Sequence, residues 1–114
     1  MIERISEADF ARRAEDAIAE LDRAFGDLAE DHDIDVQVQS GVLTVSFDEG
    51  EPGKFIISPN SSVRQLWVSA RMASYKFDWI EETGDFVLAG KNETLKQVLT
   101  QLTREQIGDP EITL

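Results

Sequence analysis

The sequence predicts an α+β fold in which two helices pack on one face of an antiparallel sheet of about six strands, as a two-layer sandwich. Near each end of the chain, apolar residues recur every three or four positions, which is the spacing of an amphipathic helix. Between these segments, short stretches alternate apolar and polar residues and are separated by turn residues. A run of strands flanked by helices favours helices on one sheet face and an exposed face opposite.

The first helix is expected to begin at Ser6, which can cap it, and to end near Ala29. Its apolar stripe consists of Phe10, Ala14, Ala17, Leu21, Phe25 and Leu28. This stripe marks the face that should cover the sheet.

Strands dominate the middle of the chain. A hairpin is expected at residues 36–47, with Ser40 and Gly41 as its turn. A turn rich in Gly and Pro follows at residues 48–53, and Pro59 is expected to end the third strand. The third to sixth strands are expected at residues 54–58, 65–69, 75–79 and 86–88.

The second helix is expected to be capped by Asn92 and to close near residues 108–110, which read Gly-Asp-Pro. Its apolar side carries Leu95, Val98, Leu99 and Leu102. Three aromatic residues ahead of it, Phe77, Trp79 and Phe86, are assigned to core or sheet packing.

The composition limits the classes of function. With 114 residues, the chain is the size of one domain, expected to span residues 1–114. It has no Cys and one His, which excludes disulfides, thiolate zinc sites, Cys-ligated clusters and thiol catalysis. Residues 1–7 lack the features of a signal peptide, and no segment approaches the roughly 20 apolar residues of a membrane span. A cytoplasmic protein is expected.

The net charge of −12 is concentrated in one half of the chain. Residues 1–51 hold 15 acidic and 4 basic residues, a balance of −11, whereas residues 52–114 hold 8 and 7, a balance of −1. Such a field repels nucleic acid and anionic lipid and attracts cations and basic protein surfaces. The alternative is an acidic surface that serves solubility alone.

Acidic residues should form an edge along the first helix. At roughly 100° per residue, four of them fall within about 40° of one another beside the apolar stripe: Asp9, Asp16, Glu20 and Asp27. Four more follow directly and would extend the edge if the first strand packs alongside: Glu30, Asp31, Asp33 and Asp35. Glu15 and Asp22 form a smaller pair on the opposite flank.

Carboxylate oxygens suit iron in either oxidation state and other hard divalent cations. Side chains on a convex helix cannot enclose an ion, so binding should be weak, multiple and partly through water. The alternative is a solvated face that binds no metal. His32 could add a nitrogen ligand or remain unoccupied.

Trp67 is expected to lie exposed in the middle of the sheet, because alternation sends Leu66 and Val68 inward. An exposed Trp is a typical anchor for a protein partner. The alternative is a Trp packed beneath a loop or beside Arg64. Nearby loops and strands supply a polar and basic rim: Asn60, Ser61, Arg71 and Lys76.

Three segments resemble the frataxin family in residues and spacing: residues 40–47 (SGVLTVSF), 65–69 (QLWVS) and 75–79 (YKFDW). The likeness covers residues 7–107 and is to the bacterial, CyaY-like branch of the family. It implies two helices on an antiparallel sheet, weak iron binding by acidic residues of the first helix and first strand, and docking on a cysteine desulfurase and an iron–sulfur scaffold protein.

The resemblance also assigns positions. Acidic positions of the family match Glu7, Asp9, Asp22, Asp27, Asp31, Asp33 and Asp35, and its exposed sheet residues match Gln65 and Trp67. The chain departs from the family at residues 58–62 (SPNSS), where many members carry Asn and Gln ahead of a Pro, and at Lys76, where mitochondrial members often carry Arg.

The leading hypothesis is therefore a binding module, monomeric or forming oligomers with iron, that meets iron and a desulfurase through its acidic edge and a scaffold through the Trp67 face. No catalytic motif is found in the sequence. Two alternatives stay open: a ferroxidase that oxidises Fe²⁺ on the edge, and an acidic adaptor that binds basic proteins without metal.

Overall fold

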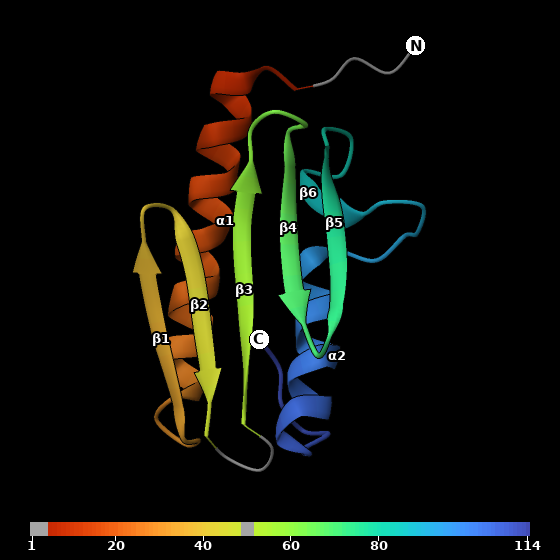
Figure 1. Cartoon of the computed structure of the whole chain (residues 1–114). Helices are drawn as coiled ribbons and strands as arrows, with labels where there is room; N and C mark the ends of the chain where they lie inside the picture. Colours follow the sequence, from red (N-terminus) through yellow and green to blue (C-terminus); the bar gives the residue numbers. More distant parts are fainter. Residues whose placement is uncertain (1–4, 49–51) are drawn as a thin grey trace.

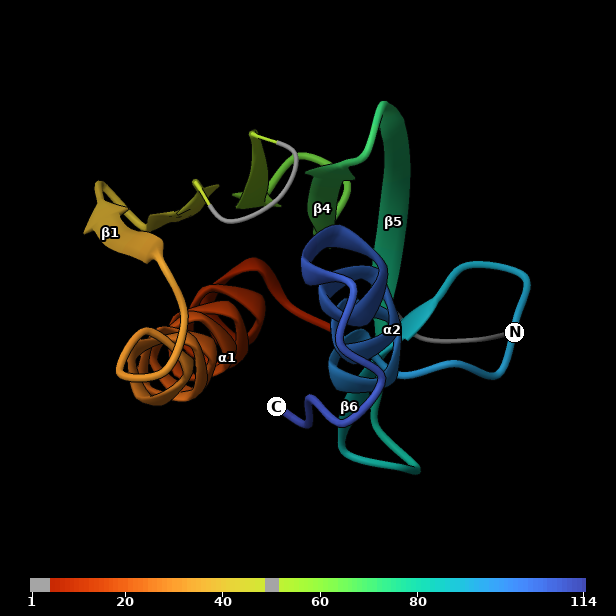
Figure 2. The same ribbon diagram turned by 90° about the horizontal axis from the view of Figure 1, so that it is seen from below.

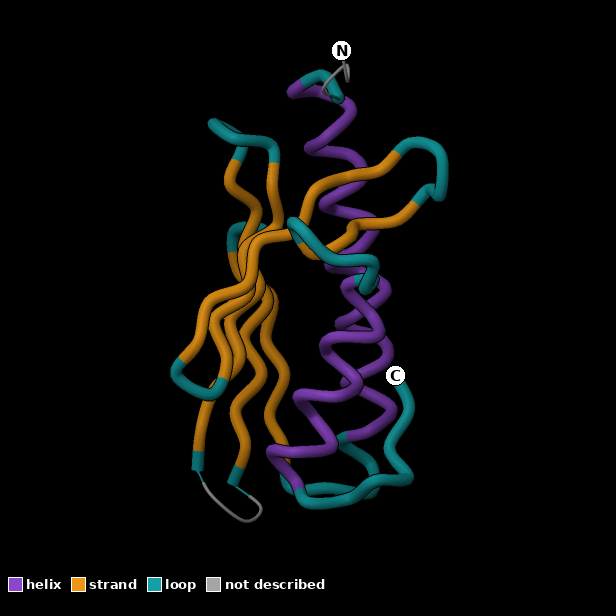
Figure 3. Tube along the Cα trace, turned by 90° about the vertical axis from the view of Figure 1, so that its right-hand side faces the viewer, coloured by secondary structure: helices purple, strands orange, loops and turns teal. Residues whose placement is uncertain are grey.

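In the residues that the computed structural model describes, 5–48 and 52–114, the chain forms a six-stranded sheet with two helices on one of its faces (Figure 1). The helices are α1 (Glu7–Leu28) and α2 (Leu95–Ile107). The strands are β1 (Ile34–Gln39), β2 (Val42–Phe47), β3 (Gly53–Asn60), β4 (Gln65–Ala70), β5 (Ala73–Ile80) and β6 (Asp85–Leu88). Figure 3 shows the helices and strands as separate layers. The predicted α+β sandwich is confirmed.

Each strand pairs in antiparallel fashion with the next one along the chain, in the order β1 to β6. The two helices divide the covered face between them. Figure 2 shows α1 beneath the β1 side of the sheet and α2 beneath β4 and β5. Neither helix carries an apolar stretch long enough to span a membrane, and the described residues contain no other helix.

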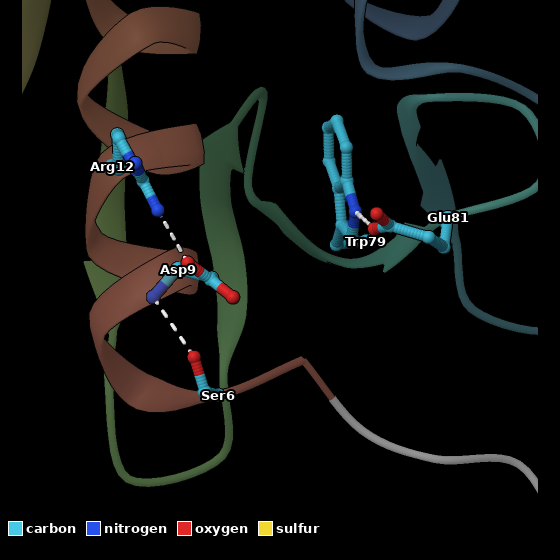
Figure 4. Close-up of polar contacts among 5 residues, drawn as sticks. All are labelled: Ser6, Asp9, Arg12, Trp79 and Glu81. Atoms are coloured by element: carbon cyan, nitrogen blue, oxygen red, sulfur yellow. Dashed lines mark hydrogen bonds and ion pairs between the residues drawn. The ribbon is translucent and has the colours of Figure 1, made fainter.

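The first helix follows its sequence pattern closely. The hydroxyl of Ser6 accepts a hydrogen bond from the backbone N–H of Asp9 at 3.1 Å and caps the first turn (Figure 4). The buried face consists of Phe10, Ala14, Ile18, Leu21 and Phe25. The helix therefore begins as predicted, and its buried face agrees with the predicted stripe except that Ile18 is buried while Ala17 and Leu28 are only partly buried.

The β1–β2 hairpin turns at Ser40 and Gly41, as predicted. Both have left-handed backbones, with φ of 53° and 78°. Two such residues make the tight turn that matches the twist of paired strands. Positions 49–51 of the next predicted turn lie outside the described residues.

The prediction that Pro59 ends the third strand is wrong. β3 continues to Asn60, and Pro59 pairs with Leu66 of β4. On the other side, the pairing of β3 with β2 ends at Ile57. A proline can therefore be accommodated, because the ladder on that side has already stopped.

The start of the second helix also differs from its prediction. Thr94, and not Asn92, caps α2. Its hydroxyl accepts from the backbone N–H of Gln97 at 3.2 Å, and the Gln97 side chain accepts from the backbone N–H of Thr94 at 2.9 Å. This reciprocal capping box satisfies two N–H groups instead of one. The predicted end is confirmed, since Gly108 has a φ of 80°.

The core lies between the sheet and the two helices. Its largest fully buried side chains are Phe10, Phe25, Phe47, Phe55 and Phe77. Phe86 is buried, and Trp79 packs against the core with part of its ring exposed, so the predicted packing roles of these residues are confirmed.

Candidate functional site

The acidic residues of α1 lie on two flanks that face different parts of the molecule. Asp16 and Glu20 line a crevice of about 250 Å³ with Phe86 and Lys96, at the start of α2. On the other flank, Glu15 and Asp22 line a groove with Val38 of β1 and Pro59 of β3. The first strand therefore runs along the Glu15–Asp22 flank. The expectation that the larger acidic edge continues into this strand is wrong.

That edge instead continues towards the end of the chain. Asp27 and Asp31 line a further crevice together with Lys96 and Leu114. The rotation of α1 about its axis explains why the larger edge faces α2 and not β1. Burial of the apolar stripe that contains Phe10 determines which flank of the helix turns towards α2. Glu30 is exposed in the loop that follows α1.

Basic side chains of the protein itself accompany the α2-facing flank. Arg12 forms an ion pair with Asp9 (Figure 4), and Lys96 Nζ lies 3.6 Å from Glu20 Oε1. The Arg13 guanidinium lies 5.0 Å from the centre of the Trp79 ring, whose Nε1 donates to Glu81. Exposed pairs of this kind stabilise the fold weakly, but they reduce the net charge available to a ligand.

The predicted acidic residues near the start of α1 and of β1 are exposed. Glu7 and Asp9 lie in the first turn of α1, where carboxylates interact favourably with the helix dipole. Asp35 alternates with Ile34 and Val36, which pack against the core, so its side chain points to the outer face. Asp33 precedes the strand, and its backbone carbonyl accepts from Asp48 at 3.1 Å.

The described residues do not bring three or more His, Cys, Asp or Glu side chains together as a group able to hold a metal ion. Single exposed carboxylates can still contact cations through one oxygen or through water. The described part of this surface therefore presents separate, exposed carboxylates and no enclosed metal site.

His32 lies where the loop after α1 meets the segment after α2. Its side chain is 16% exposed, and its Nε2 lies 3.9 Å from Asp109 Oδ2.

The outer face of the sheet brings three of the predicted partner-binding residues together. Trp67 is 37% exposed, as predicted, and its Nε1 donates to Gln65 Oε1 at 3.1 Å. Gln65 Nε2 in turn donates to Asp78 Oδ1 at 3.0 Å. The Lys76 Nζ lies 4.8 Å from the centre of the Trp67 ring, within cation–π distance.

Asn60, the fourth predicted residue, has a local role. Its side-chain oxygen accepts from the backbone N–H of Ser62 at 3.2 Å, and it lies opposite Gln65 in the register of β3 and β4. It therefore shapes the loop beside the Trp67 face.

Sequence reasoning missed two members of this face. Ile56 is 39% exposed and shares a depression of about 370 Å³ with Trp67 and Lys76. Alternation along β3 could have identified it, since Phe55 and Ile57 face inward. Asp78 could not be assigned without the register that places it opposite Gln65.

Comparison with known proteins supplies the family. A family model described as the frataxin-like domain matches residues 3–109. The iron-sulfur cluster assembly protein CyaY of Ectopseudomonas mendocina is 36% identical over 106 residues, which cover 91% of each chain. The protein of the same name from Azotobacter vinelandii is 34% identical over 99 residues, covering 85% of this chain and 88% of that one.

A solved structure agrees with the fold. The frataxin of Psychromonas ingrahamii superposes with a TM-score of 0.70, covering 90% of this chain and 91% of that chain at 17% identity. The family model spans most of the sequence, the CyaY relatives align along nearly its whole length, and the helices and sheet match: the chain belongs to the frataxin family.

Proposed function

We propose that this frataxin is a cytoplasmic accessory protein of iron–sulfur cluster assembly that binds iron weakly on its acidic surface and docks on a cysteine desulfurase and its scaffold protein. The observation that carries the proposal is the charge of residues 7–35, which hold 11 acidic and 3 basic residues, a balance of −8, all on exposed positions of α1, the loop after it and β1. Relatives that align with nearly the whole chain are named for cluster assembly.

Iron is the cargo of this surface and not a resident cofactor. Carboxylate oxygens suit Fe²⁺ and Fe³⁺, and they bind other hard divalent cations in the same way. Ions held by separate carboxylates exchange readily, which suits delivery or sensing. The chain has no Cys, so the thiolates that ligate a finished cluster must come from another protein.

The two faces of the molecule suit two protein partners. The acidic helix side complements a basic surface, which we assign to the desulfurase. The outer sheet face presents Trp67, Ile56 and Lys76 around this depression, which we assign to the scaffold.

An anaerobic Fe²⁺ titration followed by backbone-amide NMR tests the iron half of the proposal. We expect selective shifts or broadening at Asp27, Asp31, Asp33 and Asp35, with the Trp67 face unchanged. A variant with these four residues replaced by Asn should lose the response. Its matched control changes the charge by the same amount elsewhere, with Gln at Glu82, Glu93, Glu105 and Glu111, and should keep it.

The outcomes separate the candidate functions. If the four-Asn variant responds to Fe²⁺ as the unmodified protein does, the iron-binding assignment is wrong. Desulfurase binding that weakens with salt but is indifferent to iron would assign the surface to an acidic adaptor. Oxygen consumption faster than that of Fe²⁺ in buffer, and lost in the same variant, would indicate a ferroxidase.

A further inference from the structure

A groove of about 570 Å³ lies between α1 and one end of the sheet, where the end of β1, the turn after it and the end of β3 contribute to its lining. The helix contributes small side chains, among them Ala11, Ala14 and Ala19, which leave room beside Ile18. The sheet side is formed by Val38, Gly41, Pro59 and Ser61. Most of this lining is apolar, and Val38 is 45% exposed, so water now covers surface that a partner could bury.

The charge around this groove differs from that of the other crevices along α1. Glu15 and Asp22 are exposed on its helix side, and none of the described residues that line it is Lys or Arg. The crevice at the start of α2 contains Arg13 and Lys96, and the one near the end of the chain contains Arg23 and Lys96. Only the groove beside β1, among these three, combines an apolar floor with carboxylates that lack a basic neighbour in its lining.

We propose that this groove receives an aliphatic side chain from a partner's basic segment, with Lys or Arg residues on either side of it pairing with Glu15 and Asp22. The proposal rests on the proposed function for the kind of partner, a protein with a basic surface, and adds where and how its segment is anchored. Charge complementarity selects a basic segment, and the alanine-lined floor selects a side chain such as Leu.

The spacing of the carboxylates fits an extended segment. Glu15 and Asp22 are seven residues apart, which places them about 10 Å apart along the helix axis. In an extended chain, residues i, i+2 and i+4 face the same way, and the outer two lie about 13 Å apart. The two spacings differ by about 3 Å, which flexible Lys or Arg side chains can span. Lys-x-Leu-x-Lys is therefore the simplest pattern that matches the groove.

The test compares two peptides by NMR titration of the labelled full chain. One contains Lys-Ser-Leu-Ser-Lys, and the other has Gly in place of Leu. We expect the Leu peptide to bind about tenfold more tightly than the Gly peptide, because part of one Leu side chain becomes buried. Its binding should shift the amide signals of Ala11, Ala19 and Val38. Salt should weaken both peptides and leave their ratio unchanged.

Filling the groove provides the second arm. Ala11→Leu combined with Ala19→Leu should abolish the preference for the Leu peptide, because both positions line the groove and are exposed. Ala8→Leu is the matched control, since Ala8 is exposed on the same helix outside this lining, and it should retain the preference.

Three results would overturn the inference. The two peptides could bind with equal affinity, or the shifts could centre on the Trp67 face. Shifts at the groove that grow with protein concentration in the absence of peptide would assign the groove to a second copy of the chain. The iron titration separates this failure from failure of the proposed function. Equal peptide affinities with a normal iron response contradict only the groove. A missing iron response with an intact Leu preference contradicts only the iron binding.

Discussion

The side chain of Trp67 is held on the outer sheet face by a short series of contacts. Its Nε1 donates to Gln65, which is itself fixed by Asp78. Replacing Gln65 with Ala should leave the indole N–H without this acceptor and free the ring to reorient. We expect faster solvent exchange of the Trp67 indole proton by NMR and weaker scaffold binding, with a loss of global stability below about 1 kcal/mol.

Gln101→Ala is the control, because Gln101 is exposed on α2 and its side chain donates to Glu105, one turn further along the same helix. An indole exchange rate that stays the same in Gln65→Ala would show that the contacts do not position Trp67.

Single residues of this face differ in how far the sequence could predict them. The exposure of Trp67 follows from alternation along one strand, which is a local property. The contact with Lys76 depends on the register of β4 and β5. That register is set by a turn at Arg71 and Met72, with φ of 48° and 65°. Neither residue is Gly or Asn, so the sequence carried no turn signal there.

At the level of elements, the start of α2 offers a direct comparison between two capping residues. Thr94→Ala removes the hydroxyl that accepts from Gln97 and should lower the free energy of unfolding by about 1 kcal/mol. Asn92→Ala changes the residue that the sequence favours as the cap and should leave stability nearly unchanged, since the observed cap lies two residues later, at Thr94. Urea unfolding of both variants decides between them, and equal losses would contradict the assignment of Thr94.

Most elements were predictable because their signals are short-range. The apolar stripe and Ser6 cap of α1, and the Ser40-Gly41 turn, act within a few residues and were assigned from the sequence. The two boundary errors have different causes. Pro59 remains in β3 for a tertiary reason, because the neighbouring ladder has ended. At the start of α2 a local signal was missed, since Thr94 and Gln97 have the spacing of a capping box.

For the whole molecule, the sequence gives the amount of acidic charge but not its arrangement in space. Which flank of α1 meets β1 depends on how the helix rotates over the sheet, and which carboxylates meet basic residues depends on where α2 lies. These contacts join residues distant in sequence, as Glu20 and Lys96 do. The division into a flank accompanied by basic residues and a groove without them was therefore visible only in the folded structure.

The uneven charge should also limit the stability of the fold. Carboxylates that attract a cation repel one another when it is absent, so the surface that suits binding opposes folding. The variant with Asn at Asp27, Asp31, Asp33 and Asp35 changes the net charge from −12 to −8 and should unfold at a temperature higher by on the order of a few degrees at low salt. Sodium chloride should raise the Tm of the unmodified protein more than that of the variant and narrow the difference, because ions screen the repulsion. Calorimetry across a salt series measures these Tm values.

The control with Gln at Glu82, Glu93, Glu105 and Glu111 carries the same net charge, but its substitutions lie in the half with a balance of −1. Its Tm should therefore rise less. Equal gains in the two variants would mean that total charge, and not its concentration around α1 and β1, limits the stability.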